Sequence, residues 1–151
     1  MLSSELCIAG LVAESSDAVV KALAARLLEA GHVRPSFEQA ALVRERRSPT
    51  GLPFPGCGVA LPHADPEHVV TPAIAVATLA KPVPFRQMGA PATKLDVALV
   101  VMPALTAKEQ AAGDLSRIIE LLQDEALRRV LLQAKASDEM MAALSGRLGA
   151  R

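Results

Sequence analysis

Two of the three histidines of this 151-residue chain lie within one short segment, Leu61-Pro62-His63-Ala64-Asp65-Pro66-Glu67-His68. The Pro62 ring restricts its own φ and holds Leu61 before it in an extended conformation. The imidazole of His63 is therefore expected to leave the chain in one defined direction. Much of a histidine is neutral near pH 7, so one ring nitrogen can attack without an additional base. His63 is thus a candidate nucleophile.

A cationic segment precedes these histidines. Three arginines lie between Arg44 and Arg47, and Thr50 and Gly51 follow shortly after. Guanidinium groups match the geometry of phosphate oxygens, and a hydroxyl beside backbone N–H groups in a tight turn can bind the same anion. Three arginines at a helix end also fit a solvated terminus. Upstream of His63, however, they indicate a site that handles an anion.

A metal site is the competing interpretation of the same segment. The side chains of His63, Asp65 and His68 are possible metal ligands, and Cys57 lies close enough in sequence to join them. The spacing matches no recurring metal motif, and Pro66 restricts how the side chains could converge. A metal-dependent hydrolase therefore stays an alternative, while we expect no metal and no cofactor.

The elements that position these residues follow from apolar periodicity and from turn residues. The order is one strand, two helices, three strands and three helices, which predicts an α/β (α+β) fold. We expect a three-layer α/β/α sandwich whose mixed central sheet has about four to five strands, with helices on both faces. The predicted strands cover 5–13, 58–62, 73–79 and 95–102, the helices 18–30, 36–46, 108–123, 125–135 and 137–148, and a loop 48–58.

Cap residues support the first two helices. Ser15 lies where a helix N-cap is expected, and Gly31 lies where a glycine ends a helix. Ser36 and Gln39 have the three-residue spacing of a capping box. His32 directly follows the first helix, so we interpret it as structural.

The composition describes an electrically balanced chain. It contains 16 Lys and Arg, 16 Asp and Glu, and three aromatic residues, all Phe. This argues against nucleic-acid binding, which needs a basic patch and, for single strands, aromatic platforms. No apolar run approaches the roughly 20 residues of a membrane span, and the N-terminus lacks the positive start of a signal peptide. We expect a single domain over residues 1–151, cytoplasmic and not inserted in a membrane.

Three short motifs occur in a characteristic order, namely Arg44-Glu45, Pro49-Thr50-Gly51 and Gly58-Val59-Ala60-Leu61-Pro62-His63. In this order and spacing the chain resembles the type-2 enzyme IIA (EIIA) components of the bacterial phosphoenolpyruvate-dependent sugar phosphotransferase system, the mannitol/fructose superfamily. The stretch from Asp65 to Gly89 is most similar to the galactitol-like branch. The resemblance covers nearly the whole chain.

The resemblance implies a phosphotransferase that carries a phosphoryl group on a histidine. His63 falls on the family's phosphorylated histidine, and Arg44 falls on the arginine that steadies the phosphoryl group. The donor would be the phosphocarrier protein HPr and the acceptor a IIB component during sugar uptake. Arg44, Thr50 and backbone N–H groups would stabilise the transferred charge without a metal. The oligomeric state stays open.

One feature departs from the family. Mannitol- and fructose-type members carry a second histidine near the first, and the region 108–122, where it is expected, has none. Gln110 or Asp114 is a candidate for that place, and His68 is a candidate for the second imidazole or a structural loop residue. A regulatory protein of the nitrogen-related branch would share the chemistry of His63 and is the alternative function.

Overall fold

The computed structural model describes residues 2–148, and their centre is a five-stranded sheet. Neighbouring strands lie in the order β1-β4-β5-β3-β2. β1 is parallel to β4 and β3 is parallel to β5, whereas the pairs β4–β5 and β2–β3 are antiparallel. The predicted mixed sheet is therefore confirmed. The strands are β1 Cys7–Leu11, β2 Leu52–Phe54, β3 Cys57–Ala60, β4 Ala73–Gln87 and β5 Ala90–Ala104.

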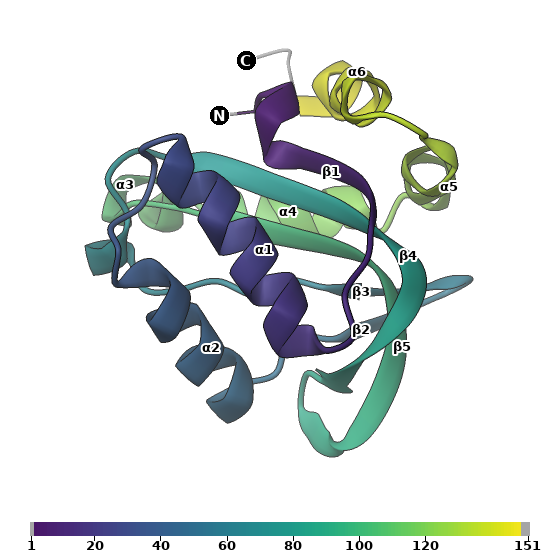
Figure 1. The fold of residues 1–151 in the computed structure, drawn as a ribbon, viewed down its shortest axis with the longest axis horizontal. Helices are drawn as coiled ribbons and strands as arrows, with labels where there is room; N and C mark the ends of the chain where they lie inside the picture. The colour runs from purple at the N-terminus through teal and green to yellow at the C-terminus, as the bar shows by residue number, and fades with distance from the viewer. Residues whose placement is uncertain (1, 149–151) are drawn as a thin grey trace.

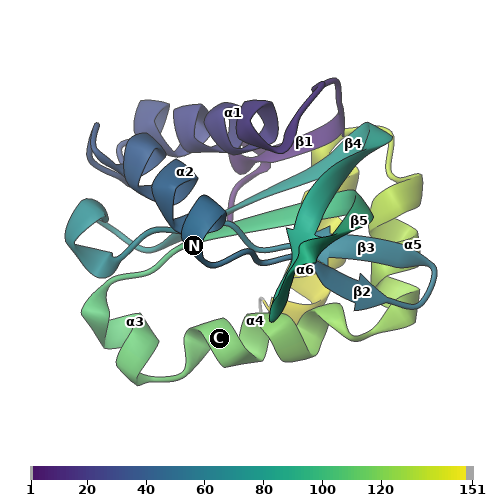
Figure 2. The ribbon, with the colours of Figure 1, turned by 90° about the horizontal axis from the view of Figure 1, so that it is seen from below.

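Helices cover both faces of the sheet, as predicted (Figures 1 and 2). α1 and α2 lie on one face, and α4, α5 and α6 lie on the other. The helices are α1 Ser16–Glu29, α2 Phe37–Arg47, α3 Ala107–Ala111, α4 Asp114–Leu122, α5 Glu125–Gln133 and α6 Ser137–Leu148, with short 3-10 turns at Ser4–Leu6 and Pro66–His68. None of the helices within residues 2–148 has the length and apolar character needed to cross a bilayer.

The sheet separates two hydrophobic cores. Side chains alternate along β4, so that Ala75 and Ala77 face α1 and α2 while Ile74 and Val76 face α4, α5 and α6. All of these positions are buried. Burial on both faces explains why this strand is a nearly continuous apolar run in the sequence.

The two central strands are longer than predicted. Beyond the predicted ends, residues 80–94 continue as a hairpin that turns at Gly89, which has a φ of 76°. Val83 and Phe85 on this extension are buried, whereas Pro82 and Pro84, which alternate with them, are exposed. The prolines mask a period-two pattern that points every second side chain to the core, because proline is usually a sign against a strand.

Two further elements differ from the prediction. The predicted loop 48–58 contains the short strand β2, which reaches β3 through a turn with Gly56 at a φ of 77°. The single helix predicted over 108–123 is wrong, because the chain breaks into α3 and α4 at Gly113. Gly113 has a φ of 80°, a left-handed conformation that glycine adopts readily and that interrupts a helix.

The ends of α1 form as predicted. The Ser15 side chain accepts a hydrogen bond from the backbone N–H of Ala18 at 3.1 Å. At the other end Gly31 has a φ of 81°, and the N–H of His32 donates to the carbonyl of Leu27 at 3.0 Å. This is the glycine-terminated helix end that the sequence predicts.

Candidate functional site

His63 lies just beyond the end of β3, half-buried, in the turn that leads to Asp65. Its Nδ1 lies 2.8 Å from the carbonyl oxygen of Leu61. A carbonyl oxygen can only accept, so Nδ1 carries the proton and Nε2 keeps its lone pair. The structure thus assigns the neutral tautomer whose free nitrogen is Nε2.

Burial favours the neutral imidazole. It lowers the pKa of His63 below the ordinary value of 6.5, against the hydrogen bond to Leu61, which raises the pKa. The positive charge of Arg44 adds to the lowering, and the negative charge of Asp65 opposes it. Since desolvation penalises the charged ring, His63 is held neutral near pH 7.

A chain of hydrogen bonds supports the backbone on which His63 depends. The N–H of Leu61 donates to Oγ1 of Thr50 at 3.0 Å. Thr50 in turn donates its hydroxyl to Oε1 of Glu45 at 2.8 Å and its backbone N–H to Oε2 at 3.0 Å. The motif predicts an anion-binding hydroxyl at Thr50, but its side chain is buried and its proton is directed to Glu45.

His63 opens into a hollow of about 250 Å³ between the loop after β3 and the start of α4. Arg44 and Asp65 form one side, with Nη1 of Arg44 3.6 Å from a carboxylate oxygen of Asp65. The side chains of Arg44 and Asp65 are 41% and 65% exposed, so solvent screens this ion pair and weakens it. The lining residues are Arg44, His63, Asp65, Gln110, Gly113, Leu115 and Ser116.

The opposite side of the hollow is the break between α3 and α4. Gly113 is the N-cap of α4, and Leu115 and Ser116 belong to its first turn. Backbone N–H groups in a first helical turn have no partner within the helix and favour an anion. Gln110, at the end of α3, adds a neutral amide. Arg44, His63 and these donors thus line one hollow.

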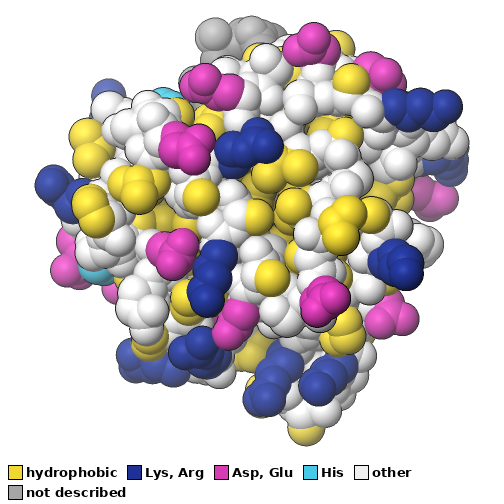
Figure 3. All heavy atoms as spheres, viewed as in Figure 1, with side chains coloured by type: hydrophobic (Ala, Val, Ile, Leu, Met, Phe, Trp, Pro, Cys, Tyr) yellow, Lys and Arg dark blue, Asp and Glu magenta, His cyan; other side chains and the backbone are white. Residues whose placement is uncertain are grey.

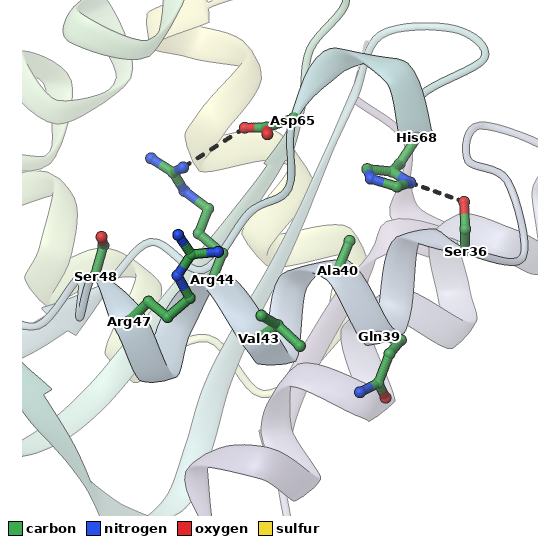
Figure 4. A pocket seen from close by; sticks show the side chains of 9 residues that line it. All are labelled: Ser36, Gln39, Ala40, Val43, Arg44, Arg47, Ser48, Asp65 and His68. Atoms are coloured by element: carbon green, nitrogen blue, oxygen red, sulfur yellow. Dashed lines mark hydrogen bonds and ion pairs between the residues drawn. The ribbon is translucent and has the colours of Figure 1, made fainter.

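His68 lies elsewhere, against a second hollow of about 520 Å³ that runs along α2 (Figure 4). Its Nδ1 is 2.8 Å from Oγ of Ser36, so Ser36 does not form the predicted capping box and makes no side-chain cap bond to α2. Arg44 and Asp65, which Figure 4 draws beside each other, line both this hollow and that of His63. The hollow is lined by Ser36, Gln39, Ala40, Val43, Arg44, Arg47, Ser48, Asp65 and His68.

This arrangement decides among the candidates for the second polar group beside His63. Gln110 lines the hollow of His63, whereas Asp114 is not part of its lining and ion-pairs with Arg117 at 2.6 Å. His68 lines the hollow along α2 and does not line that of His63. Gln110 is therefore the candidate that the structure brings to His63.

The proposed metal ligands do not converge. Within residues 2–148, no group of three or more His, Cys, Asp and Glu side chains is arranged to hold a metal ion. Cys57 and Cys7 are free thiols. His32, on the connection between α1 and α2, pairs through Nδ1 with Oγ1 of Thr71, just before β4, at 2.9 Å, which is consistent with a structural role.

Comparison with known proteins identifies the family. Residues 1–146 match the family described as phosphoenolpyruvate-dependent sugar phosphotransferase system, EIIA 2. The chain belongs to this family. A relative in Bacillus subtilis, the PTS system fructose-specific EIIABC component, is 36% identical over 111 residues. The match covers 72% of this chain and 16% of that protein, so the chain corresponds to a small part of the relative's length.

Solved structures of EIIA proteins share the fold. The IIA protein PtxA of Streptococcus mutans, described as a putative PTS IIA, has a TM-score of 0.78 at 25% identity, over 95% of this chain and 88% of that chain. Enzyme IIAMTL of Escherichia coli, solved in complex with phosphorylated enzyme IIBMTL, has a TM-score of 0.80 at 23% identity, over 97% of this chain and 99% of that chain. The three-layer architecture is thus that of the EIIA family.

Sequence reasoning misses two contributors to this site. Glu45 belongs to the first motif, but its contact with Thr50 five residues later depends on how the loop after α2 folds back. Ser116 carries no motif, and only the helix break at Gly113 brings it to His63. A glycine inside an otherwise apolar helical pattern is the signal that could have indicated this break.

Proposed function

We propose that this chain is a cytoplasmic phosphoryl carrier of a sugar phosphotransferase system. It accepts a phosphoryl group from the phosphocarrier HPr on Nε2 of His63 and passes it to a IIB component. One observation carries the proposal, namely a half-buried imidazole whose Nδ1 is occupied by the Leu61 carbonyl beside a hollow lined by Arg44. Membership of the EIIA family supports it.

The transfer is an in-line displacement between two imidazoles. The Nε2 lone pair of His63 attacks the phosphorus, and the bond from phosphorus to the donor's ring nitrogen breaks, leaving its electron pair on the donor. His63 keeps its Nδ1 proton and becomes a phosphorylated imidazolium, which the Leu61 carbonyl stabilises. No proton has to leave the site in this step.

Hydrogen-bond donors for the negatively charged phosphoryl oxygens line the hollow of His63. Arg44 supplies a guanidinium, and Gln110 and the N–H groups of the first turn of α4 supply neutral donors. The stretch from Asp65 to Gly89, which resembles the galactitol-like branch of the family, supports a sugar system of the galactitol or fructose type. Thr50 and His68 lie outside the hollow of His63, so their roles are indirect.

The test is phosphorylation by purified phosphoenolpyruvate, enzyme I and HPr, followed by detection of acid-labile phosphate. We expect the wild type to be labelled at Nε2, the His63→Ala variant to lose the label, and His32→Ala and His68→Ala to keep it. Labelling that survives in folded His63→Ala contradicts the proposal. The labelled protein is then mixed with IIB, because retention of the phosphoryl group would favour a regulatory protein of the nitrogen-related branch.

A further inference from the structure

We propose that Glu45 and Thr50 are positioning residues that set the tautomer of His63 through the backbone of Leu61, so that only Nε2 is available for the phosphoryl group. The expected effect on the rate of phosphorylation rests on the proposed function. The tautomer of His63 is a property of the unphosphorylated protein. Neither residue lines the hollow of His63, so both act at a distance from the reacting atoms.

Glu45, Thr50 and Leu61 are joined by a series of hydrogen bonds, and the direction of each bond follows from the adjacent one. The Thr50 hydroxyl has one proton, and a backbone N–H already points at its oxygen from Leu61. That proton is therefore turned to the carboxylate of Glu45, which accepts it at 2.8 Å. Glu45 also accepts the N–H of Thr50 itself, so two bonds hold the threonine in one orientation.

Leu61 transmits this order to the imidazole. Its N–H is held by Thr50, while its carbonyl accepts the Nδ1 proton of His63 at 2.8 Å. The proline at position 62 restricts the rotation between these two groups, because a residue before proline is confined to extended conformations. Fixing the N–H of Leu61 thus fixes the direction of its carbonyl.

The rest of the fold anchors the loop that carries Thr50. The N–H of Gly51 donates to the carbonyl of Arg86 at 3.0 Å, and the N–H of Met88 donates to the carbonyl of Gly51 at 2.8 Å. A Cβ at Gly51 would lie 2.5 Å from the carbonyl oxygen of Arg86, so the two backbones are in contact. The long β4–β5 hairpin therefore clamps the loop beside Thr50.

Because Glu45 is in a partly buried environment, breaking its hydrogen bonds to Thr50 is expected to cost free energy. Burial raises the pKa of Glu45 from 4.5, and the hydrogen bonds from Thr50 and the charge of Arg44 oppose this rise. If the threonine hydroxyl is removed, the buried N–H of Leu61 and one carboxylate oxygen of Glu45 lose their partner. Unsatisfied buried groups drive rearrangement of the surrounding backbone.

The test replaces the hydroxyl by a methyl group of the same size in Thr50→Val and restores it in Thr50→Ser. ¹⁵N NMR of the His63 ring measures the tautomer directly in the unphosphorylated protein. We expect one Nδ1–H tautomer in wild type and Thr50→Ser, and a mixture in Thr50→Val. Phosphorylation by HPr should slow on the order of 10- to 100-fold in Thr50→Val, as expected for a misplaced nucleophile, and Thr50→Ser should recover most of the rate.

Thr78→Val is the matched control. Thr78 is also buried, and its Oγ1 also accepts a backbone N–H, from Gly10 at 2.9 Å, but this bond joins β4 to β1, the edge strand opposite β2. It should leave the His63 tautomer unchanged. Glu45→Gln should give an intermediate fraction of the Nδ1–H tautomer, because an amide oxygen accepts only part of what the carboxylate accepts.

A wild-type tautomer and rate in folded Thr50→Val would overturn the inference and leave the proposed function intact. Conversely, a wild type that HPr does not phosphorylate would refute the proposed function, while the tautomer measurement would still test the positioning role.

Discussion

The three histidines differ in what their Nδ1 atoms contact. Nδ1 of His32 and Nδ1 of His68 lie beside the hydroxyls of Thr71 and Ser36, which can donate or accept. Nδ1 of His63 lies beside a carbonyl, which can only accept. Only His63 therefore has its tautomer imposed by its partner, and a defined free nitrogen is what a nucleophile requires.

The lowered pKa of His63 predicts the pH dependence of phosphorylation. Because burial lowers this pKa below 6.5, the ring should stay neutral as the pH falls through 6.5 and become protonated only below its own, lower pKa. The rate of phosphorylation should fall in that lower range. In the unfolded chain the His63 ring binds a proton at a higher pH than in the folded protein. The free energy of unfolding should therefore also decrease as the pH falls below 6.5. An NMR titration midpoint for His63 at or above 6.5 would show that burial does not dominate.

Gln110 gives a second prediction for single residues. Gln110→Glu places a negative charge beside the phosphoryl group without changing the size of the side chain, so transfer should slow at least about tenfold by charge repulsion, roughly 1.4 kcal/mol in the barrier. Gln110→Ala should slow it less. Gln39→Glu, on the exposed face of α2 in the other hollow, is the matched control. Equal rates for the Gln110 and Gln39 variants would remove Gln110 from the site.

Among the elements, the break between α3 and α4 has the clearest consequence for the site. A continuous helix would satisfy the N–H groups of Leu115 and Ser116 internally. The left-handed Gly113 instead starts a new helix there, and its first turn lines the hollow of His63. The position of a helix end thus creates donors that no side chain supplies.

Replacing this glycine should be costly. Gly113→Ala requires a left-handed alanine, so we expect the free energy of unfolding to fall by about 1–2 kcal/mol and phosphorylation to slow. Gly146→Ala is the control, because Gly146 lies in α6 with open space where a Cβ would be and has no left-handed φ. That variant should gain about 0.5–1 kcal/mol. Denaturant unfolding measures both, and a stabilised Gly113→Ala would show that α3 and α4 merge without strain.

On the scale of the whole molecule, elements from both faces of the sheet contribute to the candidate site. The face with α1 and α2 carries Arg44 and Glu45, while the opposite face supplies α4. The overall charge of zero also hides local order, because cations gather along the lower edge of the face drawn in Figure 3. Arg46 and Arg86 line one hollow of this structure, next to α1.

A buried arginine links α5 to the end of α4 and to the turn between β2 and β3. Arg128 on α5 is 2% exposed, donates to the carbonyls of Leu122 at 2.7 Å and Pro55 at 2.9 Å, and lies 5.0 Å from the ring centroid of Phe54. Arg128→Ala should lower the free energy of unfolding by about 2–4 kcal/mol, because it removes these bonds and opens a cavity.

The neighbouring arginine provides the control for this prediction. Arg129 forms an exposed ion pair with Glu125 at 3.2 Å. Arg129→Ala should change stability by less than about 0.5 kcal/mol. Equal losses in the two variants, measured by denaturant unfolding, would contradict the role of Arg128.

The sequence by itself determined the layers and the family motifs, because these depend on periodicity and on local order around His63, and it made His63 the candidate nucleophile. The extension of β4 and β5 was missed because proline usually indicates against a strand, and the break at Gly113 was missed because a glycine inside a helical pattern fits either a continuous helix or a helix end. Only the tertiary structure decided that Thr50 faces Glu45, that Gln110 and not His68 lines the hollow of His63, and that Nε2 is the free nitrogen. These are contacts between separate elements, and hydrogen-bond direction follows from which groups the fold brings together.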